Sequence, residues 1–178
     1  MRWRSRMQAR ELVGIVRPMT HADVEQVLAW RNHPDIRRYM FITAEISPEE
    51  HARWFERIAA DPLRHPLVFE MSSSPMGFVN FAQTATGHVA DWGFYLSPDA
   101  PKGTGARLGA AALEWAFRRL GLHKVCGQAL AFNESSIRFH QRRGFRQEGV
   151  LRAQHFDGRL FHDVICFGLL AQEWRQTK

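Results

Sequence analysis

A stretch rich in small residues, positions 96–109, offers backbone groups that could bind phosphate. An apolar, strand-like segment leads into it, and an alanine-rich, helix-like segment follows. The first N–H groups of a helix lack intrahelical partners and carry partial positive charge, which favours an anion at that end. Glycines would let a pyrophosphate approach the backbone closely, and a basic side chain could add a charge. The residues concerned are Lys102, Gly103, Gly105, Arg107 and Gly109.

The spacing of these glycines argues against two common phosphate sites. The pattern G-x-x-x-x-G-K-[ST] is absent from the stretch, so it is not a P-loop. The stretch also follows a strand in the middle of the chain instead of opening a βαβ repeat, which counts against a Rossmann fold. An ordinary glycine-rich turn between a strand and a helix stays open as the alternative.

A second stretch, residues 133–145, places polar and titratable residues at fixed spacing. It reads NESSIRFHQRRGF and fits the pattern N-x-x-[SA]-I-x-[LF]-[YH]-x-x-x-G-F. Together with the 96–109 stretch it resembles the GNAT superfamily of acetyltransferases, and the resemblance covers nearly the whole chain. It implies an enzyme that transfers an acetyl group from acetyl-CoA to a primary amine. The cofactor-binding residues that it implies are Leu96, Lys102, Gly103, Thr104, Gly105, Ala106, Arg107, Leu108, Gly109, Asn133 and Ser136.

The same resemblance implies direct transfer while both substrates are bound. A general base takes a proton from the amine, and backbone N–H groups of the strand at 92–96 stabilise negative charge on the carbonyl oxygen. His140 stands where many members have a tyrosine that protonates the leaving thiolate, so it is the predicted acid, with Tyr95 as a further catalytic candidate. Neither Cys126 nor Cys166 lies in a motif with an activating histidine and carboxylate, which disfavours an acetyl-cysteine route.

The N-terminal half resembles a narrower branch of the superfamily. Segments 30–34, 39–41 and 46–54 are similar to the nucleotide-sugar N-acetyltransferases of pseudaminic-acid biosynthesis, which acetylate the amino group of a UDP-4-amino-4,6-dideoxy sugar. An arginine could pair with phosphate bidentately, aromatic rings could cover a sugar or uracil, and a histidine could serve as the base. The acceptor-binding residues implied are Arg31, Asn32, Met40, Phe41, His51 (the candidate base), Trp54 and Asn80. Several of these could instead be ordinary core or surface residues.

Two other functions fit the same sequence. A ribosomal-type N-terminal acetyltransferase would need an open groove for a polypeptide, whereas the aromatic residues between positions 39 and 54 favour a closed pocket for a small ligand. A CoA-binding module without catalytic activity is the alternative from another functional class. The only residue that suggests it is His140, which stands where many members of the superfamily have a tyrosine.

The elements that must position these residues are delimited by apolar alternation, turn residues and helix caps. Strands are expected at 12–17, 67–71, 77–81, 89–96, 124–130, 149–156 and 161–169, and helices at 21–32, 48–58, 105–120 and 134–143, with a short piece at 36–39. The order predicts a single α/β (α+β) domain, with a mixed central sheet of about seven strands and helices on both faces.

Composition fits one globular domain of 178 residues, of which 45% are hydrophobic and 24% charged. Four arginines in the first ten residues account for +4 of the formal net charge of +6, so we expect a basic N-terminal extension, 1–11, before a nearly neutral domain, 12–178. That distribution does not predict nucleic-acid binding. No apolar run approaches the roughly 20 residues of a membrane span, and no spacing fits a metal site. We therefore expect a cytoplasmic enzyme that uses acetyl-CoA and a small-molecule acceptor, and a homodimer is the assembly to consider.

Overall fold

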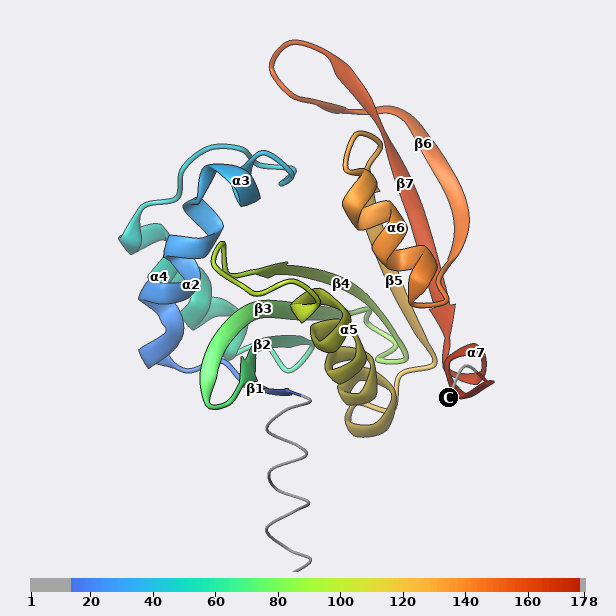
Figure 1. Ribbon diagram of the computed structural model, residues 1–178, viewed down its shortest axis with the longest axis horizontal. Helices are drawn as coiled ribbons and strands as arrows, with labels where there is room; N and C mark the ends of the chain where they lie inside the picture. The colour runs from blue at the N-terminus through green and yellow to red at the C-terminus, as the bar shows by residue number, and fades with distance from the viewer. Residues whose placement is uncertain (1–13, 177–178) are drawn as a thin grey trace, which may run out of the picture.

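The computed structural model describes residues 14–176 and is built on one seven-stranded sheet (Figure 1). The predicted extension at 1–11 and the start of the predicted strand at 12–17 lie outside these residues. The strands are β1 (Ile15–Pro18), β2 (Arg64–Met71), β3 (Ser74–Gln83), β4 (Val89–Leu96), β5 (Lys124–Leu130), β6 (Arg146–Phe156) and β7 (Phe161–Leu170). The helices are α2 (Val24–Asn32), α3 (Pro34–Arg37), α4 (Pro48–Ala59), α5 (Thr104–Glu114), α6 (Glu134–Arg142) and α7 (Ala171–Gln176), with a 3₁₀ turn η1 (His21–Asp23) and a π-helical segment η2 (Trp115–Arg119).

The sheet is mixed, as predicted, with the strand order β1-β2-β3-β4-β5-β7-β6. Every neighbouring pair is antiparallel except β4 and β5, which run parallel. That parallel pairing covers three residue pairs, from Val89 with Lys124 to Asp91 with Cys126. Beyond them both strands continue without pairing to each other, so the sheet opens between its two halves.

Helices cover both faces of the N-terminal half of the sheet, which also confirms the prediction. Because side chains alternate along a strand, Leu67 and Phe69 of β2 pack in one core with Leu108 of α5. The residue between them, Val68, packs in a second core with Phe55 of α4 and with residues of α2. The β6–β7 hairpin extends beyond α6 (Figure 1).

The β6–β7 hairpin exposes large apolar side chains along its length. Their exposed fractions run from 41% to 68% in Val150, Leu151, Phe156, Leu160 and Phe161. A homodimer stays a prediction. Among the described residues, no helix is long and apolar enough to cross a membrane.

Local signals explain where the helices near the site begin and end. The Ser47 hydroxyl accepts from the Glu50 N–H at 3.2 Å, and the Glu50 carboxylate accepts from the Ser47 N–H at 3.0 Å, which forms the predicted capping box of α4. The Asn133 side chain accepts from the Ser136 N–H at 3.1 Å and so caps α6. Pro34 begins α3, because proline is favoured at the first position of a helix.

Two elements differ from the sequence expectation. The predicted helix at 105–120 consists of α5 followed by the π-helical segment η2. Helix α7 was not predicted, and with 6 residues it is too short to show helical periodicity.

Gly109 allows α5 and α6 to pack closely. A Cβ atom at this position would lie 2.7 Å from Cζ of Phe139 and 3.2 Å from Cδ of Arg143, both contributed by the α6 segment. Position 109 was predicted to bind the cofactor, but this geometry gives it a packing role. At Gly105, one turn earlier on α5, the nearest atom to such a Cβ is Cδ1 of Leu96 at 3.6 Å.

We predict that Gly109→Ala lowers the free energy of unfolding by about 1–3 kcal/mol, because the added methyl group overpacks the contact with Phe139. Gly105→Ala is the matched control, since its methyl group finds room. Urea unfolding of both variants checks the prediction. Equal stability of the two variants would contradict it.

Candidate active site

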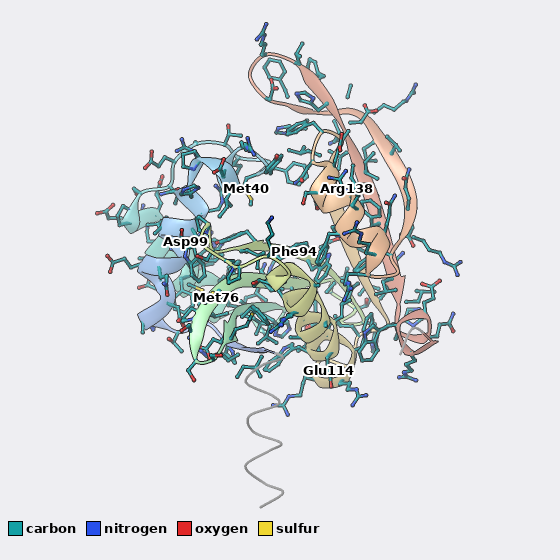
Figure 2. All side chains as sticks on the ribbon, in the orientation of Figure 1. Met40, Met76, Phe94, Asp99, Glu114 and Arg138 are labelled. Atoms are coloured by element: carbon teal, nitrogen blue, oxygen red, sulfur yellow. The ribbon has the colours of Figure 1, made fainter. Side chains whose placement is uncertain are left out.

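A cleft of about 330 Å³ lies where β4 ends and the sheet opens. Its walls come from α3, the end of β4, the start of α5 and the start of α6. Figure 2 shows Met40 on the α3 side of this opening and Phe94 of β4 at its centre. The lining residues are Asp35, Ile36, Tyr39, Met40, Phe94, Tyr95, Leu96, Ser97, Pro98, Gly105, Asn133, Ser135, Ser136 and Phe139.

Among the described residues, backbone groups at the end of β4 face this cleft without a partner on β5. The Ser97 N–H donates to Met76 O, and Val89 O accepts from the Thr84 N–H, both at 2.8 Å. Odd-numbered residues of β4 therefore bond to β3, and even-numbered residues point their backbone groups toward β5. Because the pairing with β5 has ended, the N–H groups of Phe94 and Leu96 are available to a carbonyl oxygen in the cleft.

The first turn of α5 has free amide donors and open space, as a phosphate group requires. Gly103 caps the helix in the left-handed conformation, with φ of 89°. Among the described residues, the N–H groups of Gly103 and Gly105 have no acceptor. No atom lies within 4 Å of a Cβ placed at Gly103. The neighbouring side chains of Lys102 and Arg107 are exposed. The first turn of α5 therefore fits the pyrophosphate of CoA.

The side chains of the other residues predicted for the cofactor are partly used in structural contacts, and cofactor binding by these residues stays a prediction. Thr104 is buried and its hydroxyl donates to Pro101 O at 2.7 Å, which fixes the loop before α5. Leu108 is fully buried in the core, and Ala106 is exposed on α5. Asn133 and Ser136 line the cleft, although the Asn133 carbonyl is used to cap α6.

The geometry of His140 does not support its predicted role as proton donor to the thiolate. Its side chain is 1% exposed and does not line the cleft. Nδ1 lies 2.8 Å from Ser136 O, and Nε2 lies 3.1 Å from the indole nitrogen of Trp92. Burial lowers the pKa of His140, so the ring is neutral near neutral pH, and both nitrogens are already engaged.

Three buried polar atoms on the α2–α4 side of the sheet lack hydrogen-bond partners among the described residues. They are Nη1 of Arg31, Nδ1 of His51 and Oδ1 of Asn80. The other terminal nitrogen of Arg31 donates to Ile42 O at 2.6 Å, which fixes the guanidinium. Buried polar groups are nearly always paired in folded proteins. Unpaired groups on α2, α4 and β3 therefore mark the α2–α4 side of the sheet as a candidate ligand site, although none of these three residues lines the cleft itself.

Burial and mutual charge shift the pKa values of these groups. Burial lowers the pKa of His51, and the positive charge of Arg31 lowers it further, so His51 is a neutral base near neutral pH. Burial also lowers the pKa of Arg31. Burial raises the pKa of Tyr95 far above its usual value, against a smaller opposing influence of Arg31. Tyr95 thus keeps its proton and can donate a hydrogen bond in the cleft that it lines.

The remaining residues predicted to bind the acceptor have different surroundings in the structure. Met40 lines the cleft. Asn32 instead holds the following loop, because its side chain both donates to and accepts from the backbone of Ile46, at 2.8 and 3.0 Å. Phe41 is 48% exposed and contacts the ring of His155. Trp54 stacks on His51 at 4.8 Å. It therefore supports the candidate base.

Sequence reasoning missed Phe94 and Phe139 as cleft residues. Phe94 lies in an apolar strand, where aromatic residues usually indicate core positions, and Phe139 lies in a helix of mostly polar residues. The available signal was the position of Phe94, since it precedes Tyr95 on the strand predicted to carry the amide donors. Among the described residues, no three His, Cys, Asp or Glu side chains are grouped so that they could hold a metal ion.

Comparisons with known proteins agree with this arrangement. A family model described as an acetyltransferase (GNAT) domain matches residues 15–146. Acetyltransferase PseH of Campylobacter jejuni is 26% identical over 123 residues, which cover 69% of this chain and 76% of PseH. Spermidine N(1)-acetyltransferase of Escherichia coli is 24% identical over 152 residues, which cover 84% of this chain and 82% of that protein.

The fold also matches a solved acetyltransferase. Spermidine N-acetyltransferase from Vibrio cholerae, solved in complex with CoA and spermine, aligns with a TM-score of 0.85 at 21% identity, over 91% of this chain and 98% of that chain. This similarity confirms the GNAT-type fold predicted from the sequence. The family model covers most of the chain, and the cleft has the donors that an acyl carrier with a pyrophosphate requires. The chain therefore belongs to the GNAT acetyltransferases and is an acetyl-CoA-dependent N-acetyltransferase.

Proposed function

We propose that this enzyme acetylates the amino group of a nucleotide sugar, namely the 4-amino group of a UDP-amino-dideoxy sugar, in pseudaminic-acid biosynthesis. The observation that carries the proposal is Nη1 of the half-buried Arg31 guanidinium, which is buried and has no hydrogen-bond partner among the described residues. A guanidinium fixed in this way suits a phosphate group, which it can bind through two parallel hydrogen bonds. The unpaired His51 and Asn80 atoms supply further polar contacts for a sugar.

Charge argues for this acceptor over a polyamine, the acceptor named for two similar proteins. Asp35 is the charged residue among those that line the cleft, and its carboxylate lies 3.8 Å from the guanidinium of Arg38. The cation of Arg31 would repel a polyamine at close range. A sugar diphosphate has the opposite charge, and Arg31 therefore favours it.

Aromatic contacts also favour a small acceptor over the end of a polypeptide. The rings of Tyr39 and Phe132 stack at 6.2 Å, and those of Phe41 and His155 meet edge to face at 5.7 Å. These two contacts link the segment after α3 to the β5–α6 loop and to the β6–β7 hairpin. A closed arrangement of this kind suits a compact ligand better than an extended chain.

The groups in and around the cleft each have a role in the proposed reaction. Acetyl-CoA, bound through its pyrophosphate at the first turn of α5, supplies an activated acyl group. The N–H groups of Phe94 and Leu96 can donate to the acyl oxygen. Neutral His51 can take a proton from the acceptor ammonium. Burial raises the pKa of the Cys126 thiol, which favours direct transfer over an acetyl-cysteine route.

We predict that Gly105→Glu weakens acetyl-CoA binding by at least about tenfold, because a carboxylate would stand where the pyrophosphate is held. Ala110→Glu is the matched control, since it adds the same charge to an exposed position of the same helix. Isothermal calorimetry measures both affinities. Unchanged affinity in a folded Gly105→Glu protein would place the cofactor elsewhere.

We predict that Arg31→Met raises KM for a UDP-amino sugar by about 10- to 100-fold, the effect of losing charge-assisted hydrogen bonds of roughly 1.5–3 kcal/mol. Acetyl-CoA affinity should not change. Arg57→Met, at an exposed position of α4, is the control. Steady-state kinetics with the UDP-amino sugar and with spermidine tests the assignment. Efficient acetylation of spermidine that Arg31→Met leaves intact would favour a polyamine acceptor instead.

We predict that His51→Ala lowers kcat by roughly 10²–10⁴-fold at pH 7, the usual contribution of a general base. Because burial lowers the pKa of His51, the wild-type base should stay neutral to a pH below the ordinary histidine value of about 6.5. The deficit of the variant should shrink as pH rises and the free amine becomes abundant. A pH–kcat profile measures this, and a deficit that is constant with pH would argue for a structural role.

A further inference from the structure

A hydrogen bond between two buried rings lies at the point where β4 leaves β5. The last residue pair of the two strands is Asp91 with Cys126, and the next residues are Trp92 and Gly127. The indole N–H of Trp92 donates to Nε2 of His140 at 3.1 Å. A Cβ atom on residue 127 would collide with Nε2 of His140 and lie 2.8 Å from Nε1 of Trp92. Glycine at 127 therefore makes room for this bond.

His140 fills the space between the parting strands. Its ring stacks on Phe167 of β7 at 4.7 Å with an interplanar angle of 6°, and it meets Phe145 edge to face at 5.1 Å. Phe94 and Phe139, which line the cleft, have ring centroids 5.9 and 5.7 Å from that of His140. His140 thus supports the cleft wall from behind and does not touch the cleft itself.

The hydrogen bonds fix both the tautomer and the charge of this histidine. Ser136 O can only accept, so Nδ1 carries the proton and donates to it at 2.8 Å. Nε2 is then a lone-pair acceptor for the indole of Trp92. The groups that face the ring from every neighbouring element are uncharged: Trp92, Phe94, Gly127, Phe139, Phe145 and Phe167.

We infer that His140 is a positioning residue, which holds β4 apart from β5 through its bond to Trp92 and so sets the width of the opening that receives acetyl-CoA. It acts on the cofactor through Trp92 and the cleft wall, and it is not the acid that protonates the thiolate. The inference rests on the cofactor half of the proposed function and does not depend on which amine is the acceptor.

Four variants test this role: His140→Leu, His140→Gln, Trp92→Phe and the double variant His140→Leu with Trp92→Phe. His140→Leu removes the acceptor and Trp92→Phe removes the donor, so each should weaken acetyl-CoA binding by about tenfold, the loss of one buried hydrogen bond. The double variant should be no weaker than either single variant, since both remove the same interaction. His140→Gln keeps an oxygen acceptor for Trp92 and should restore most of the affinity.

The glutamine variant separates positioning from acid catalysis. Glutamine cannot give up a proton, yet kcat should stay within about fivefold of wild type, with an unchanged pH profile. A general acid at position 140 would instead make His140→Gln lose roughly 10²–10⁴-fold in kcat at normal acetyl-CoA affinity. That result, or independent effects of the two single changes in the double variant, would overturn the inference.

Calorimetry with acetyl-CoA alone keeps the test independent of the acceptor. If the sugar assignment fails, the four affinities still decide the role of His140. Wild-type protein that does not bind acetyl-CoA would overturn the inference together with the cofactor site. Thermal unfolding identifies any variant that fails to fold. If His140→Leu fails to fold, the inference can still be tested with the other two single variants: Trp92→Phe should weaken acetyl-CoA binding, and His140→Gln should keep most of the affinity.

Discussion

The site depends on an interruption in the sheet, where β4 and β5 part after three residue pairs. Backbone groups that leave a ladder must find another partner or remain exposed to water. Here the freed groups of Phe94 and Leu96 line the cleft. Aromatic rings of β4, α6 and β7 pack together where the two strands part. The same opening brings the first turns of α5 and α6 to its mouth, so the sheet interruption positions both the amide donors and the cleft.

The two proposed binding regions would use different chemistry for recognition. The proposed cofactor donors are backbone amides at Gly103 and Gly105 and on β4, which require only a loop that tolerates close approach. The proposed acceptor groups are side-chain atoms of Arg31, His51 and Asn80, contributed by α2, α4 and β3. Burying these atoms without partners costs stability. Such a cost is expected where a ligand completes the hydrogen bonds.

Local patterns in the sequence predicted the layout of the fold well. The seven strands, the capping box at Ser47 and the asparagine cap of α6 depend on neighbouring residues, and they formed near the predicted positions. Side-chain roles were harder to predict, because they depend on contacts between distant segments. Gly109 belongs to a stretch of sequence with a plausible phosphate pattern, but in the fold it lies within α5, and the ring of Phe139 takes the space beside it. The role of His140 likewise depends on Trp92 and Gly127, which only the folded sheet brings to it.

Phe94 and Tyr95 are consecutive residues of β4 whose side chains pack in different cores, one with α5 and α6 and the other with α2 and α4. Adjacent positions of one strand thus form both walls of the cleft. Inserting or deleting a single residue in β4 before this point would exchange the two walls. The length of β4 is therefore expected to be invariant during divergence of the enzyme. Specificity for a new acceptor would more readily evolve through changes of length in the segment between α3 and α4, because such changes do not alter the register of a strand.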